Sequence, residues 1–149
     1  MFCQRVMFYC LWYNIPEGVD YMVVLIIAYS FAFLFYIASL LIHVLVLYKK
    51  ISFKLVNGGR SKDFKEQQKQ SQVSILIIVV MSIYILSTLL FPSFRGTIVF
   101  LVFTSLLVLF WLLGTVMQLL GTQFEKRVVV WINLIGLVSH VLLLITYFD

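Results

Sequence analysis

Four long runs without a charged residue constrain this chain more than any other feature. They cover residues 21–48, 73–94, 96–124 and 128–148. A helix needs about 20 residues to cross the ~30 Å hydrocarbon core of a bilayer, and each run is long enough. Hydrophobic residues make up 63% of the chain and charged residues 11%, whereas soluble domains have about half and a quarter. These patterns predict an all-α, integral membrane four-helix bundle.

The expected spans are about residues 21–48, 73–94, 97–120 and 128–148. A transmembrane β-barrel would require alternating polarity in each segment, and runs such as "SILIIVV" do not alternate. The sequence contains no internal repeat and no domain boundary, so we expect residues 1–149 to form one unit. The first twenty residues do not resemble a signal peptide or a transit peptide.

Positive charge is concentrated in the segment 49–72, between the first two expected spans. It holds seven basic and two acidic residues, a balance of +5. By the positive-inside rule this loop faces the cytoplasm or the mitochondrial matrix, and both termini face the opposite side. Contacts with lipid headgroups, anionic ones included, are expected at the basic residues of its first part. These are Lys49, Lys50, Lys54, Arg60 and Lys62.

A second interpretation of the same charges is a topology signal on solvated helix faces. Asp63, Glu66 and several glutamines dilute the cluster, which favours this interpretation over lipid recognition. Nucleic acid is not an expected partner, because only Phe53 and Phe64 could stack on bases.

Turn and capping signals predict how the loops fold. "NGG" at 57–59 predicts a turn, with "KKISFKLV" prolonging the first helix before it and Ser61 capping the second helix after it. The segment 49–72 would then be a basic helical hairpin that protrudes from the membrane. Thr122-x-x-Glu125 is a capping box for the last helix. The short "FPSFRGT" predicts that the second and third spans form a tight antiparallel pair.

The amino-terminal segment 1–18 is expected to lie in the membrane interface. Phe2, Val6, Tyr9 and Tyr13 recur at helical spacing, which favours an interfacial helix. Cys3 and Cys10 are seven residues apart, too far for a disulfide within one helix, and we expect both to be free thiols.

Polar residues form a stripe on the first and on the last span. The first span carries Tyr36, Ser39 and His43, and the last carries Asn133, Gly136 and His140, at steps of three and four. Counting ~1.5 Å per residue from the basic end, His43 matches Asn133 at ~9 Å and Tyr36 matches His140 at ~20 Å. Ser39 falls opposite Gly136. We expect the two helices to pack along this seam and to hydrogen-bond across it.

The two histidines could also be ligands of a cofactor. A haem between His43 and His140 would require similar depths, but the estimated depths differ by ~10 Å. A ligand role toward a partner's cofactor stays open. The seam supplies no carboxylate, so we expect both imidazoles to be neutral. We predict no catalytic residue, no cofactor and no metal site in this chain, because the spans hold no acidic group and no nucleophile with a base.

Three function classes remain after these exclusions. We expect a non-catalytic accessory subunit that stabilises or tunes a larger membrane protein complex through helix packing. The alternatives are a homo-oligomeric pore or exchanger, and a membrane enzyme or cofactor carrier completed by a partner. The absence of a recognisable leader and the abundance of small helical subunits in energy-transducing membranes favour the mitochondrial inner membrane and its respiratory chain over the endoplasmic reticulum or the plasma membrane.

Overall fold

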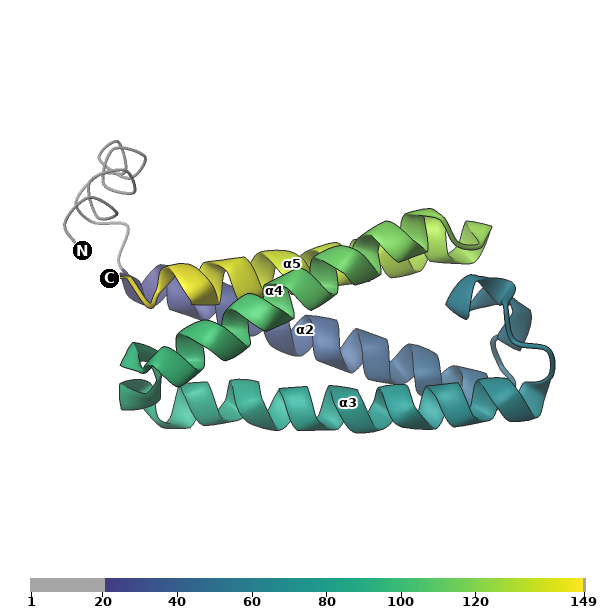
Figure 1. Cartoon of the computed structure of the whole chain (residues 1–149), viewed down its shortest axis with the longest axis horizontal. Coiled ribbons are helices and arrows are strands. Elements are labelled where there is room, and N and C mark those ends of the chain that lie inside the picture. The colour runs from purple at the N-terminus through teal and green to yellow at the C-terminus, as the bar shows by residue number, and fades with distance from the viewer. Residues whose placement is uncertain (1–20, 149) are drawn as a thin grey trace.

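A computed structural model describes residues 21–148, and this part of the chain is helical throughout, apart from its loops (Figure 1). Four of its helices are long and apolar enough to cross a membrane. They are α2 (Tyr21–Leu47), α3 (Phe64–Leu90), α4 (Ile98–Leu119) and α5 (Val130–Ile145), and a π-helical turn, Glu125–Val129, leads directly into α5. The prediction of an all-helical fold is confirmed for the described residues, and four of the helices have the length and composition that a membrane span requires. The expected interfacial helix lies outside the described residues.

The helices are arranged in the spatial order α3, α2, α5, α4. α2 packs against both α3 and α5, and α5 packs against α4. The prediction of a tight α3–α4 pair is wrong. The turn Pro92–Gly96 joins their ends, and Tyr84 Oη lies 2.8 Å from Thr104 Oγ1, but the helices then diverge toward the basic end (Figure 1). A short turn determines where the ends of two helices meet. The directions of the two helix axes are determined by the other helices against which they pack.

Small residues allow α2 and α5 to approach closely at the centre of the bundle. Ala28, Ala32 and Phe35 of α2 are fully buried. A Cβ atom on Gly136 of α5 would lie 2.7 Å from the ring of Phe35, so only glycine fits at this position. The Phe35 ring also meets Trp111 of α4 edge to face at a centroid distance of 4.6 Å. One aromatic ring thus joins α2, α4 and α5.

The first arm of the predicted basic hairpin is not a helix. α2 ends at Leu47, and Lys49 adopts a positive φ of 57°. The Lys50 N–H then donates to Leu45 O at 2.8 Å and the Lys49 N–H to Val46 O at 2.9 Å, the pattern of a Schellman helix stop. The chain continues as two 3-10 turns, Phe53–Leu55 and Asn57–Gly59.

The expected cap of the second arm is also corrected. Asp63, not Ser61, caps α3, and its side chain accepts the Glu66 N–H at 2.8 Å. The Ser61 hydroxyl donates instead to Gln67 Oε1 at 2.7 Å. An aspartate at this position is as good a cap as serine, so the sequence alone did not distinguish them.

Candidate functional site: a polar seam that opens into a pocket

The seam between α2 and α5 contains one of the three expected pairs as a hydrogen bond. Tyr36 Oη lies 2.9 Å from His140 Nε2, and His140 Nδ1 lies 2.6 Å from Gly136 O. A neutral imidazole protonated at Nδ1 satisfies both contacts, because Nδ1 then donates to the carbonyl and Nε2 accepts from the phenol. His140 is fully buried. Both ring nitrogens are hydrogen-bonded inside the bundle, and the bond to Tyr36 joins α5 to α2.

The other two expected pairs do not form hydrogen bonds. Gly136 faces Phe35 instead of Ser39, and the described residues offer no hydrogen-bond partner to His43 Nδ1. The depth count treated α2 and α5 as parallel rods, but they separate toward the basic end (Figure 1). Residues matched in depth there are therefore too far apart to bond directly.

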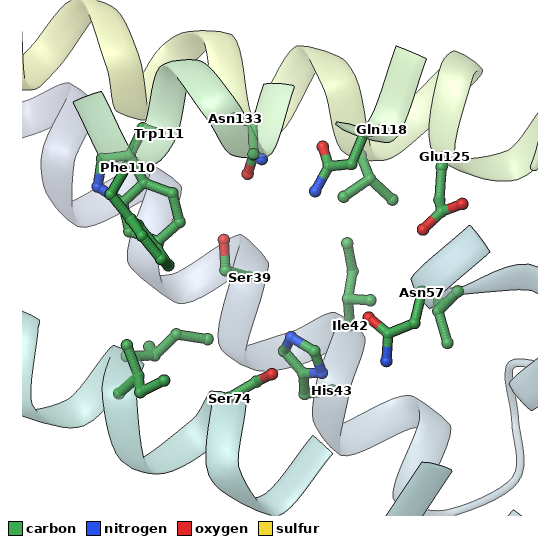
Figure 2. A pocket seen from close by; sticks show the side chains of 15 residues that line it. Ser39, Ile42, His43, Asn57, Ser74, Phe110, Trp111, Gln118, Glu125 and Asn133 are labelled. Carbon is green, nitrogen blue, oxygen red and sulfur yellow. The ribbon is translucent and has the colours of Figure 1, made fainter. Parts of the chain in front are cut away.

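A pocket of about 210 Å³ occupies the space where the helices separate. Figure 2 shows its polar side chains, which come from all four helices and from the loop at the basic end. Apolar residues, among them Ile77, Phe110 and Trp111, line the remainder. The polar lining residues are Ser39, His43, Asn57, Ser74, Gln118, Glu125 and Asn133.

Asn133 is the unusual member of this set. It is only 5% exposed, and its side chain points into the pocket (Figure 2). Among the buried polar residues that the structure describes, it alone makes no hydrogen bond. An amide without a partner is costly at membrane depth, where water is scarce. Ser39 and Ser74 line the same space, and neither hydroxyl has a protein partner within the described range.

The loop residues 57–59, here called the NGG clasp, close the basic end of the pocket. All three have positive φ, of 54°, 68° and 67°. This conformation directs the Gly58 N–H at both carboxylate oxygens of Glu125, at 3.0 Å each. On the other side, Asn57 Nδ2 donates to Gln70 Oε1 at 2.8 Å and to Gln67 Oε1 at 3.2 Å. The clasp therefore links α3 to the corner between α4 and α5.

Glu125 has two tasks at this corner. It accepts the Thr122 N–H at 2.8 Å, and the Glu125 N–H donates to Thr122 Oγ1 at 3.3 Å, which confirms the predicted capping box. It also accepts the Gly58 N–H. The basic loop and the corner Glu125–Arg127 are thus at the same end of the bundle, as the charge pattern predicted.

The predicted headgroup contacts are all on the outside of this end. Lys49, Lys50, Lys54, Arg60 and Lys62 are exposed. Lys49 Nζ lies over the Phe64 ring at 4.8 Å from its centroid. None of the five lines the pocket. Lipid contact at these residues stays a prediction.

The site therefore contains residues that were not among the predicted site residues. Gln67, Gln70 and Gly58 hold the clasp, and Gln118 and Ser74 line the pocket. For Gln118 the sequence did offer an indication, because an amide side chain within an expected membrane span is unusual. Gln67 and Gln70 instead resemble ordinary residues of a solvated helix, and nothing nearby in sequence indicates their partner.

Comparisons with protein families, with curated proteins and with solved structures found no match to this chain. The fold itself defines the class as a helical bundle with four candidate membrane spans.

Proposed function

We propose that this chain is a non-catalytic accessory subunit that stabilises or tunes a larger membrane protein complex. The observation that carries the proposal is the sparse packing of α3. Only 17% of its span is buried in the bundle, against 28% to 33% for the other three spans. α3 packs against α2, and within the described residues its hydrogen bonds to α4 are made by Tyr84, near the turn that connects the two helices.

One face of α3 suits a partner helix. Val73, Leu76, Val80 and Ile83 follow one another at steps of three and four and are 52–64% exposed. They lie on the side of α3 opposite Ile78 and Ile85, which are buried. Such a ridge can pack into the groove of a neighbouring helix by van der Waals contact, the main attraction between helices in lipid.

The internal polar groups favour a structural role over a catalytic one. Tyr29 bonds to Thr88 at 3.1 Å, and Tyr36 bonds to His140, so these hydroxyls are engaged in helix contacts. Glu125 is occupied by two backbone N–H groups. These groups would have to break structural hydrogen bonds before acting as an acid, a base or a ligand.

Site-specific photocrosslinking in native membranes tests the proposal. A photoreactive phenylalanine analogue at Leu76 is compared with the same analogue at Ile37 of α2, which is 65% exposed and lies on a different helix. We expect Leu76 to crosslink to one larger membrane protein and Ile37 to give little product. Mass spectrometry of the product, and of the complex isolated in mild detergent, identifies the partner.

The other outcomes overturn the accessory role. A ladder of copies of this chain supports the homo-oligomeric pore or exchanger. A purified assembly with visible-range absorbance supports a cofactor carrier, and crosslinks to lipid alone contradict any partner at this face. Membrane fractionation of the same cells tests the proposed mitochondrial inner membrane and respiratory-chain setting.

A further inference from the structure

The geometry points to a lipid site: the polar pocket, which is lined by all four helices and reaches the surface between α3 and α4, takes the polar head of a neutral lipid that carries a hydroxyl group beside a carbonyl group. Diacylglycerol and ceramide both have this chemistry. The inference does not depend on the accessory role, because it concerns groups within this chain alone.

The need for a polar occupant follows from Asn133. The residue is only 5% exposed, and its amide has no hydrogen-bond partner among the described residues. The amide presents two N–H donors and an acceptor oxygen. Ser39, Ser74, His43 and Gln118 bring further donors and acceptors to the same space. A ligand that both donates and accepts, as a hydroxyl next to a carbonyl does, matches this set.

The size of the pocket fits a headgroup and not a whole lipid. Sites for drug-sized ligands enclose ~300–1,000 Å³, whereas this pocket encloses about 210 Å³. The acyl chains must therefore leave it. The lining residues Ile77 of α3 and Phe110 of α4 are 36% and 50% exposed, so the wall between these helices is apolar and continues to the outer surface.

The charges of the lining favour a neutral head over a phosphate. Among residues 21–148, no lysine or arginine lines the pocket, and the one charged lining residue is Glu125. An anionic head would meet this carboxylate without a compensating cation. The basic residues of the loop are exposed on the exterior and offer anionic lipids a different place to bind.

Photolabelling of the purified full chain in phosphatidylcholine vesicles tests the site. One arm uses a diacylglycerol with a diazirine in one acyl chain and an alkyne tag, and a second arm uses the corresponding ceramide. We expect labelled peptides to centre on the Ile77 and Phe110 segments. Excess unlabelled lipid of the same class is expected to reduce this labelling about tenfold, and phosphatidic acid with the same acyl chains to leave it unchanged.

Two variants with matched controls separate the pocket from the general surface. Ser74→Leu fills the pocket from α3, and Ser87→Leu makes the same change on α3 outside it. Gln118→Met removes a polar group at nearly constant volume, and Gln123→Met is its exposed control. Labelling should fall at least fivefold in Ser74→Leu and in Gln118→Met, and stay at the wild-type level in both controls.

Three results would overturn the inference. They are labelling spread evenly over the exposed apolar surface, equal competition by phosphatidic acid, and unchanged labelling in the folded Gln118→Met protein. An even spread with normal folding would mean that water alone fills the pocket. None of these results affects the expected crosslink between α3 and a partner protein. The lipid site and the accessory role can therefore be refuted independently of each other.

Discussion

Replacing Glu125 with alanine tests whether the contact between the NGG clasp and the helix corner holds the basic loop in place. The variant loses the acceptor of two backbone N–H groups, those of Gly58 and Thr122. A hydrogen bond to a charged group contributes ~1.5–3 kcal/mol. Gly58 and Thr122 are only half-buried, so water recovers part of the loss. We expect a net cost of ~2–3 kcal/mol, which corresponds to a ~30- to ~150-fold increase in local opening.

The loop itself provides the assay. Its exposed basic residues are trypsin sites, so cleavage of the folded protein in lipid nanodiscs reports how often the loop opens, and hydrogen exchange reports on the Gly58 amide. The matched control is Glu66→Ala. Glu66 lies in the first turn of α3, is less buried than Glu125, and accepts one N–H, from Lys62, at 2.8 Å. Its loss should cost ~0.5–1 kcal/mol. Equal cleavage of the two variants, or unchanged exchange at Gly58, would refute the clasp.

The remaining predictions concern the bundle interior and its orientation. Tyr36→Phe removes the donor to His140 and should lower the free energy of unfolding by ~0.6–2 kcal/mol; a cycle with His140→Phe measures the coupling, and additive losses would contradict the bond. Gly136→Ala places a methyl group 2.7 Å from the Phe35 ring and should cost ~1–3 kcal/mol by overpacking, while Gly96→Ala, with nothing within 4 Å, should be near neutral in the same detergent unfolding assay. Glycosylation acceptor sites should stay unmodified in the basic loop and be modified at the chain ends if the protein is inserted in the endoplasmic reticulum; the reverse pattern would contradict the proposed sidedness.

The spans and the central hydrogen bond could be predicted because they follow from regular helix geometry. Charge-free runs mark helices in lipid, and a rise of ~1.5 Å per residue places side chains in depth. The depth count succeeds for Tyr36 and His140, where α2 and α5 are in close contact. It fails for His43 and Asn133, because the crossing of two helices is set by packing around Phe35 and Gly136 and is not visible in either helix alone.

The basic loop could not be predicted because its structure depends on distant partners. Gly58 bonds to a carboxylate 67 residues further along the chain. The helix stop at Leu47 uses Lys49 in a left-handed conformation, where glycine is the usual residue. A lysine there gives no local signal, so continuous helix was the natural expectation. The conformation of the loop therefore depends on hydrogen bonds to residues that are distant in the sequence.

Hydrogen bonds at the two ends of α3 explain why a pocket remains beside the middle of this helix. At one end Arg95 Nη1 donates to Tyr29 Oη at 3.2 Å and to Thr88 O at 3.3 Å, which ties the turn Pro92–Gly96 to α2 and α3. At the other end the NGG clasp ties α3 to the corner at Glu125. Both ties use polar groups near the ends of the spans. Between the clasp and Tyr84, no hydrogen bond joins α3 to α4 within the described residues. Because the bundle is tied at both ends and open in the middle, Asn133 faces a space that a polar ligand can fill. Glu125→Ala loosens the NGG clasp at one of these ends and should therefore also weaken lipid labelling of the pocket.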